Sequence, residues 1–291
     1  MAHLSFLVIC LIWGSSFILM KRATIGISPV EIAMWRVLTG GLALGLLSVL
    51  LRRPWTVQRR DLLPLLGIVL LGFVWPYTLQ PALIPRIGSA FVGMMVGFTP
   101  LLTILVSIPL LGIWPTARQM VGVLGALVCL GLLAQEGLRR EVSWEDLLLT
   151  ISVPFAYAVA NSWIRRSLGR LPSMELTLLC LLLSTLFLFP AACLTEDPAP
   201  WSSAIYWEAW GAAAILGVLG TGLSTYLFTQ LVQTKGPLFA GMVTNVVPIG
   251  AVLWGVVDGE TVTSQQVLAL LGLISMVAIV QFPASWPRKP A

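Results

Sequence analysis

Hydrophobic residues fill ten long runs along the chain, and short polar segments separate one run from the next. The runs cover approximately residues 4–20, 30–51, 62–83, 87–111, 117–134, 147–165, 173–194, 209–232, 236–257 and 265–282. A helix that crosses the hydrocarbon core of a bilayer needs about 20 apolar residues. The pattern therefore predicts an all-α integral membrane fold with ten transmembrane helices, and it leaves almost no water-soluble domain.

Composition indicates that lipid is the main surrounding of this chain. Of its 291 residues, 58% are hydrophobic and only 10% are charged. Soluble domains carry about 25% charged residues, so an ordinary soluble domain is excluded. The 17 basic residues are too few for the Lys/Arg stripe that nucleic acid requires. The expected partners are a small-molecule substrate and the lipid bilayer, with no nucleic acid, and the chain is either a monomer or a homodimer.

Cysteine and histidine give no sign of a metal site. Cys10, Cys129, Cys180 and Cys193 all lie in hydrophobic runs without a CxxC pair, and His3 is the single histidine. This arrangement predicts no metal, no cofactor and no disulfide framework.

Lysine and arginine are distributed unevenly between the two sets of connecting loops. If the N-terminus lies inside, the inner loops hold eleven of these residues and the outer loops hold five. Because basic residues concentrate in cytoplasmic loops, both termini are predicted to be cytoplasmic, in a multi-pass protein of the bacterial inner membrane. The first run lacks the basic cluster that precedes a secretory signal, so it is interpreted as a retained helix.

The second half of the chain repeats the first. A shift of 148 residues matches ten of the 35 positions from 71 to 105, including three glycines and one proline, and a shift of 144 matches Glu31 with Glu175. Each half has five spans, an odd number, so the second half enters the membrane in the opposite sense. We expect two inverted five-helix repeats, residues 1–140 and 141–291, around a central cavity. Transporters that work by alternating access are frequently built this way.

Three sequence motifs carry a family resemblance. They are Trp13-Gly14-Ser15-Ser16-Phe17 with Lys21, the Ala33-x-x-Arg36 region, and Gly236-Pro237-Leu238 with Pro248 and Gly259-Glu260. Together they resemble the EamA family of the drug/metabolite transporter superfamily, and the similarity extends over all ten spans. The resemblance implies a cavity lined by spans one, three, four, six, eight and nine, and small bacterial members of this size include exporters of amino acids and related metabolites. The chain departs from a full duplication at Gly112-Ile113-Trp114-Pro115, which replaces the acidic turn of the second half.

Charge is scarce inside the predicted spans. Arg36 is the one charge well inside a span, and Glu31 and Glu175 stand at span ends. Arginine does not release a proton at accessible pH, so Arg36 either anchors the structure by pairing with a carbonyl group or attracts a substrate carboxylate. The spans offer no interior Asp, Glu or His for proton coupling. We therefore expect facilitated diffusion without a dedicated proton-coupling carboxylate.

Uncharged polar and aromatic residues are the candidates for substrate binding. Tyr157 and Asn161 are four apart and share a helical face, and aromatic rings with methionine sulfur suit a flat or apolar ligand. The alternative for each is hydrogen bonding or packing between helices, or a place in an interfacial aromatic belt. The candidates are Trp13, Ser16, Tyr77, Met94, Tyr157, Asn161, Trp163, Thr225, Thr244 and Asn245. They favour amino acids with aromatic or large neutral side chains as substrates.

Small residues and prolines recur at matched positions in spans four and nine. Gly93 matches Gly241, and Pro100 matches Pro248. Small residues allow close helix contact, and a proline inside a helix removes a hydrogen bond and favours a kink. These four residues are interpreted either as symmetric hinges or as static packing sites and kinks.

Other classes of function are less well supported. An enzyme is not expected, because the sequence has no Ser/His dyad, HExxH motif or Gly-rich phosphate loop. A channel would need charge rings or a carbonyl filter. Proton-coupled multidrug or metabolite efflux would need an embedded carboxylate, and organophosphate or nucleotide-sugar exchange would need several inward-facing basic residues. Both remain alternatives within the transporter class.

Overall fold

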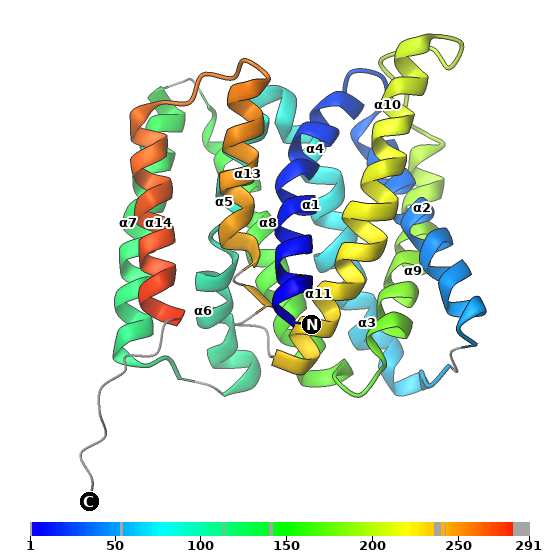
Figure 1. Ribbon diagram of the computed structural model, residues 1–291, viewed down its shortest axis with the longest axis horizontal. Helices are drawn as coiled ribbons and strands as arrows, with labels where there is room; N and C mark the ends of the chain where they lie inside the picture. The colour runs from blue at the N-terminus through cyan, green and yellow to red at the C-terminus, as the bar shows by residue number, and fades with distance from the viewer. Residues whose placement is uncertain are drawn as a thin grey trace, which may run out of the picture.

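The computed structural model is a bundle of helices that run up and down between two ends (Figure 1). It describes residues 2–52, 55–112, 114–139, 142–235, 240–241 and 243–281, and these residues form helices and turns without a strand. The expected boundary between the repeats, at 140 and 141, lies outside the described residues, as do Gly236, Pro237 and Leu238.

The first half contains five helical spans, several of them built from more than one segment. In order they are α1 (Ala2–Ala23); α2 (Pro29–Leu50); η1 (Arg59–Asp61), α3 (Leu62–Val69), η2 (Leu70–Val74) and α4 (Trp75–Ile87); α5 (Ser89–Val96) and α6 (Thr99–Leu111); and α7 (Ala117–Arg139).

The second half follows the same plan. Its segments are α8 (Trp144–Trp163) and η3 (Ile164–Leu168); α9 (Ser173–Ala192); α10 (Ala204–Ile215), η4 (Leu216–Leu223) and α11 (Ser224–Lys235); α13 (Val243–Val257); and α14 (Ser264–Gln281).

The helical segments coincide with the predicted spans. Seven of them are long and apolar enough to cross a membrane, and three shorter apolar stretches, Met120–Leu133, Val246–Val257 and Ser264–Met276, fall in the remaining predicted spans. The predicted all-helical membrane fold is confirmed. Several helices begin where a serine side chain caps the first turn: Ser28 Oγ accepts a hydrogen bond from Glu31 N at 3.2 Å, and Ser143 Oγ accepts one from Asp146 N at 3.0 Å.

Glycines allow the two halves to pack backbone to backbone. A Cβ added to Gly40 in α2 would lie 2.7 Å from the carbonyl oxygen of Gly217 in η4, and one added to Gly250 in α13 would lie 2.7 Å from the Cα of Gly14 in α1. Such contacts bring helices closer than larger residues permit. They join α2 to η4 and α1 to α13, pairs that also lie side by side in Figure 1.

Two π-helical turns occupy equivalent positions in the two repeats. Adding 148 to the bounds of η2 (Leu70–Val74) gives 218–222, which lies inside η4 (Leu216–Leu223). A π turn inserts an extra residue into an α-helix, and such turns occur frequently at functional sites. Hydropathy gave no indication of these turns.

The chain enters and leaves the bundle at the same end. The start of α1 and the end of α14 both lie at the lower end in Figure 1, whereas the end of α1 and the loop after α13 lie at the upper end. α7 and α14 pack together at one edge of the bundle.

Candidate functional site

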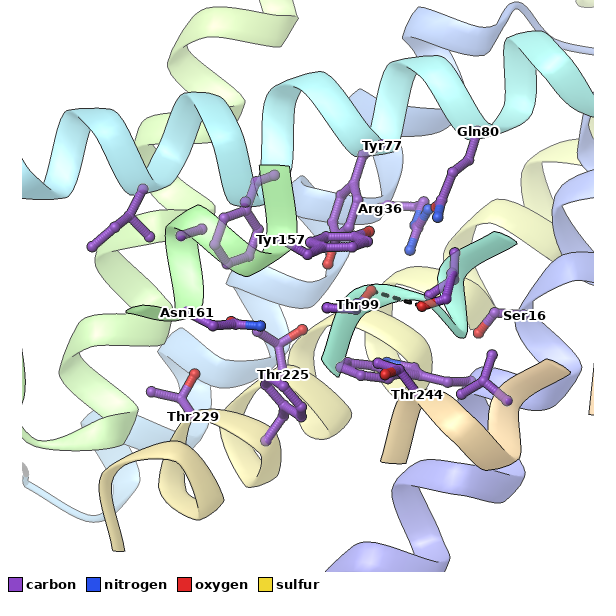
Figure 2. A pocket seen from close by; sticks show the side chains of 18 of the residues that line it. Ser16, Arg36, Tyr77, Gln80, Thr99, Tyr157, Asn161, Thr225, Thr229 and Thr244 are labelled. Atoms are coloured by element: carbon purple, nitrogen blue, oxygen red, sulfur yellow. Dashed lines mark hydrogen bonds between the residues drawn. The ribbon is translucent and has the colours of Figure 1, made fainter. Parts of the chain in front are cut away.

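A cavity lies between helices of the two halves, and Figure 2 shows the side chains around it. Its empty space, including the part open to the surroundings, is about 810 Å³. The lining residues are Trp13, Ser16, Phe17, Met20, Arg36, Ile68, Gly72, Phe73, Tyr77, Gln80, Val96, Thr99, Tyr157, Ala160, Asn161, Ile164, Thr225, Phe228, Thr229, Thr244 and Val247.

The lining comes largely from equivalent positions of the two repeats. The shift of 144 residues pairs Trp13 with Tyr157, and the shift of 148 pairs Tyr77 with Thr225. Further lining pairs with these shifts are Ser16 and Ala160, Phe17 and Asn161, Met20 and Ile164, Gln80 and Phe228, Val96 and Thr244, and Thr99 and Val247. The cavity therefore lies where the two repeats face each other.

The structure brings most of the predicted binding residues to this cavity. Those that line it are Trp13, Ser16, Tyr77, Tyr157, Asn161, Thr225 and Thr244. Asn245 belongs to α13, but its side chain lies outside what the structure describes.

Met94 and Trp163 lie elsewhere, contrary to the expected aromatic and thioether wall. Met94 is fully buried in a separate apolar cluster of α5, α6, α7, α8 and α14. The Trp163 ring packs on α3, where a Cβ added to Gly67 would lie 2.3 Å from its Cζ3 atom. Met94 stands two residues from the lining residue Val96, a turn of about 200° to the opposite face, and Trp163 lies about 100° around the helix from the lining residue Ile164.

Several lining residues were not among the sequence candidates. Phe17, Phe228 and Thr229 are examples, and Phe73 and Gly72 reach the cavity from the π turn η2. The repeat itself carried a usable signal, because Phe17 is the equivalent of the candidate Asn161.

Several polar side chains in the cavity donate hydrogen bonds to backbone carbonyl groups. Trp13 Nε1 donates to Gly220 O in η4 at 2.8 Å, Ser16 Oγ donates to Ile12 O at 2.9 Å, and Thr244 Oγ1 donates to Gly241 O at 2.7 Å. In contrast, the buried Thr225 Oγ1 has no hydrogen-bond partner within the described part of the chain. Thr225 thus retains a free hydroxyl group for a ligand.

Arg36 is the one charged residue of the lining. Its side chain lies with Cζ 3.9 Å from the centre of the Tyr77 ring, Nε donates to Thr221 Oγ1 at 3.3 Å, and Nη1 lies 3.4 Å from Met20 Sδ. Only 4% of the residue is exposed. Its contacts are thus with a ring, a hydroxyl group and a thioether.

The two span-end glutamates are engaged outside the cavity. Glu31 accepts hydrogen bonds from Trp35 Nε1 at 2.8 Å and Tyr206 Oη at 3.0 Å. Glu175 accepts from the backbone N–H groups of Thr56 and Val57 at 2.6 and 2.7 Å. Neither glutamate lines the cavity, and the lining residues include no Asp, Glu or His.

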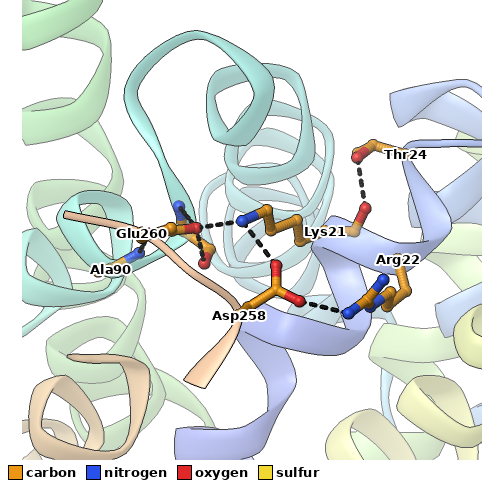
Figure 3. Close-up of polar contacts among 7 residues, drawn as sticks. Lys21, Arg22, Thr24, Ala90, Asp258 and Glu260 are labelled. Atoms are coloured by element: carbon orange, nitrogen blue, oxygen red, sulfur yellow. Dashed lines mark hydrogen bonds and ion pairs between the residues drawn. The ribbon is translucent and has the colours of Figure 1, made fainter. Parts of the chain in front are cut away.

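An ionic cluster ties three helices together at the end of the bundle opposite the start of α1 (Figure 3). We call it the latch and define it as Lys21, Arg22, Asp258 and Glu260. Lys21 Nζ lies 2.7 Å from Asp258 Oδ2 and 2.8 Å from Glu260 Oε1, and Arg22 pairs with Asp258. Glu260 also accepts hydrogen bonds from the first residues of α5, Ser89 and Ala90.

Glu260 is stabilised as a carboxylate by these contacts. Burial alone would raise the pKa of its carboxyl group, but the hydrogen bonds from Lys21, Ser89 and Ala90 outweigh it and leave the pKa below the ordinary value. Glu260 therefore stays ionised and holds α1, α5 and the turn after α13 together at neutral pH.

The opposite end has a weaker equivalent of the latch. Arg166, the repeat partner of Arg22, donates from Nη1 to the carbonyl oxygen of Leu110 at 2.9 Å. Gly112 occupies the position equivalent to Glu260 at a shift of 148, so the acid is missing there. The departure seen in the sequence thus makes the two ends of the bundle unequal.

Each of the four hinge candidates contacts the opposite span: Gly93 lies against Ala251, Pro100 against Gly241, and Pro248 against Gly97. A Cβ on Gly241 would lie 3.6 Å from Pro100, and one on Gly97 would lie 2.9 Å from Pro248. Pro100 stands in the first turn of α6, after the span breaks at Gly97, where a proline costs no helical hydrogen bond. Pro248 lies inside α13. Whether these residues act as hinges stays a prediction.

An all-helical membrane bundle of two inverted repeats, with a central cavity between them, is the architecture of a membrane transporter. The family comparison agrees: the model of the EamA-like transporter family matches residues 1–134 and 144–281, and the chain belongs to this family. The match in two blocks covers both repeats, as expected for the drug/metabolite transporter superfamily.

Comparison with solved structures supports the fold but says nothing about the substrate. One crystal structure of a protein is 21% identical to this chain, with 96% of each chain covered and a TM-score of 0.68. No curated protein matches the chain.

Proposed function

We propose that this membrane transporter exports small metabolites, above all amino acids with aromatic or large neutral side chains, by alternating access. The observation that carries the proposal is the cavity lined by equivalent positions of two inverted repeats, such as Trp13 with Tyr157. Two inverted copies can exchange conformations, and a site between them then opens to one side of the membrane at a time.

The cavity chemistry supports this substrate class. Trp13 and Phe228 have ring centroids 5.0 Å apart, and the rings of Tyr77 and Tyr157 also face the cavity. Such rings bind a flat or bulky apolar side chain by stacking and dispersion. The amide of Asn161 and the hydroxyl group of Thr225 offer neutral hydrogen-bonding groups for the polar part of an amino acid.

The cavity lining that the structure describes has no side chain suited to couple substrate transport to a proton gradient. Glu31 and Glu175 are bonded outside the cavity, and the lining residues carry no carboxyl or imidazole group. Proton antiport needs a group that gains and loses a proton during the cycle. We therefore propose facilitated diffusion, driven by the gradient of the substrate itself.

The remaining parts of the proposal concern place and partners. The protein acts in the bacterial inner membrane with both chain ends cytoplasmic, it divides into repeats at residues 140 and 141, and its partners are the substrate and lipid. It uses no cofactor, metal or nucleic acid.

The decisive experiment is transport in proteoliposomes with a panel of labelled amino acids, nucleosides and cationic drugs, with and without a pH gradient. We expect faster equilibration of phenylalanine, tryptophan and leucine, without concentration against their gradient and without an effect of pH. Acceleration of cationic drugs alone, under an imposed gradient, would replace this proposal with proton-coupled efflux. Acceleration of phosphorylated compounds alone would replace it with organophosphate exchange.

A further inference from the structure

The guanidinium group of Arg36 is a buried cation without an anionic partner. None of the ion pairs among the described residues includes it, and only 4% of the residue is exposed. Arginine stays ionised inside proteins, and a buried charge costs several kcal/mol unless a partner compensates it. The Tyr77 ring, 3.9 Å away, compensates part of this cost through a cation–π contact.

Much of the hydrogen-bonding capacity of Arg36 is unused. A guanidinium group has five N–H donors. One bonds to Thr221 Oγ1 and another meets Met20 Sδ, which is a weak acceptor. Structural arginines in membrane interiors pair with acids or with backbone carbonyl groups, and Arg36 bonds to neither among the residues that the structure describes. The free donors therefore remain for a ligand in the cavity that Arg36 lines.

We propose that Arg36 binds the carboxylate of the substrate, and that the substrates are monocarboxylates with an aromatic or apolar body, with or without an amino group. This inference rests on the proposed transport function and narrows its substrate class. The carboxylate is what the substrates must share, because Arg36 is the cavity's one charged group, whereas no lining residue carries an acid to recognise an ammonium group.

Charge balance selects a ligand with one negative charge. One guanidinium group neutralises one carboxylate, and its planar fork matches the two carboxylate oxygens. A phosphate ester with two negative charges would leave a charge uncompensated in surroundings of low dielectric constant. An organic cation would be repelled by Arg36 and would find no carboxylate in the lining.

Arg36 also breaks the symmetry of the cavity and so orients the ligand. Its repeat equivalent at the shift of 144 is Cys180, which is buried and does not line the cavity. Figure 2 shows Arg36 and Gln80 at one side, Asn161 and Thr225 at the other, and the Tyr77 and Tyr157 rings between them. The carboxylate binds at the Arg36 side, and the body of the substrate lies among the rings.

The test uses four compounds that share one ring and differ in charge: phenylalanine, 3-phenylpropionate, phenethylamine and phenylalaninamide. Binding is measured as thermal stabilisation of the purified protein, and transport is measured in proteoliposomes. The two carboxylates should bind and be transported, and the two compounds without a carboxylate should bind at least tenfold more weakly. Loss of a charge-assisted hydrogen bond corresponds to roughly a ten- to hundredfold loss of affinity.

Matched variants separate binding by Arg36 from a structural role. Arg36→Met fills similar space without charge and should lose the preference for carboxylates, whereas Arg36→Lys, which keeps the charge without the fork, should retain part of it. Arg86→Met is the control, because Arg86 pairs with Asp146 and does not line the cavity; its affinities should be unchanged. If Arg36→Met fails to fold, the binding of the four compounds to the unmodified protein and to Arg36→Lys still shows whether Arg36 selects the carboxylate.

The outcomes distinguish this inference from the function on which it rests. If phenylalanine is transported but phenethylamine binds equally well, or Arg36→Met keeps full affinity for carboxylates, this inference is wrong and the proposed function stands. If the carboxylates bind through Arg36 but nothing crosses the membrane, the proposed function is wrong. If neither carboxylate stabilises the protein, this inference is overturned, and the transport assay then decides separately on the proposed function.

Discussion

Two buried hydroxyl groups, those of Thr225 and Ser162, lack a hydrogen-bond partner among the described residues. A buried polar group without a partner costs about 1–3 kcal/mol. Thr225 lines the cavity, whereas the fully buried Ser162 does not. A ligand in the cavity can therefore form a hydrogen bond with the Thr225 hydroxyl group, whereas the Ser162 hydroxyl group stays unsatisfied whether or not a ligand is bound.

Removing each hydroxyl group tests this difference. Thr225→Val should raise the free energy of unfolding by about 1 kcal/mol, since it removes an unsatisfied polar group, and should weaken substrate binding. Ser162→Ala should also stabilise the protein but leave substrate affinity unchanged. Thermal melting with and without phenylalanine measures both effects. Equal ligand-induced shifts in the two variants would show that Thr225 does not contact the substrate.

At the scale of helices, the matched glycines Gly93 and Gly241 differ in how closely they are packed. A Cβ on Gly93 in α5 would lie 2.3 Å from the Cβ of Ala251 in α13, whereas the nearest atom to a Cβ on Gly241 is 3.6 Å away, on Pro100. The first distance is a clash and the second is an ordinary contact. Sequence equivalence therefore does not extend to equivalent packing.

This difference predicts unequal effects of alanine. Gly93→Ala should destabilise the protein by about 1–3 kcal/mol, because α5 and α13 must separate to accommodate it, and Gly241→Ala should leave the melting temperature nearly unchanged. Size-exclusion profiles and melting curves in detergent measure the result. A hinge role for Gly241 requires that larger residues there reduce transport while the yield of folded protein is maintained; equal losses of both would assign it to packing.

The latch links α1, α5 and α13 through a carboxylate, so its contribution should depend on pH. The pKa of Glu260 is lowered in the folded protein. Its stabilising effect is therefore present above the ordinary glutamate pKa of about 4.3 and is lost as the pH falls below it.

Melting curves from neutral pH down to pH 4 and below should show this loss, and Glu260→Gln should reduce it. Glu196→Gln, in an exposed loop, is the matched control and should behave like the unmodified protein. An identical pH dependence in both variants would contradict a role for Glu260 in holding the helices together.

The sequence predicted the helices better than their interruptions. Apolar runs are long, so each span could be located by hydropathy, and seven of the ten binding residues chosen from the sequence line the cavity. The π turns η2 and η4 and the break at Gly97 lie inside continuous apolar runs, so hydropathy does not mark them. Met94 and Trp163 were misplaced for a related reason: in a span that is apolar all round, periodicity does not show which face points toward the cavity.

For the molecule as a whole, two inverted repeats of five spans require both chain ends on one side of the membrane. The start of α1 and the end of α14 lie at the same end of the bundle, in agreement with this requirement. Tags added before residue 2 and after residue 281 should react equally with a reagent that does not cross the membrane. Reaction of one tag only, in intact cells, would rule out the arrangement.

Lys21 and Arg22 pair with acids, whereas Arg166, the repeat equivalent of Arg22, bonds to a backbone carbonyl group, and this difference has a kinetic consequence. In the proposed cycle, exposure of the site at the Lys21 end separates α1 from α13 and breaks the ion pairs of Lys21, whereas the equivalent contact at the Leu110 end is the single hydrogen bond from Arg166 to the carbonyl oxygen of Leu110. In this cycle we expect the two facing states to differ in energy, with the state that faces the Leu110 end favoured by the intact latch. A passive carrier cannot convert this bias into accumulation, so unequal half-saturation concentrations on the two sides must be balanced by unequal maximal velocities. Uptake and efflux assays of this protein will therefore report different apparent affinities for one and the same site.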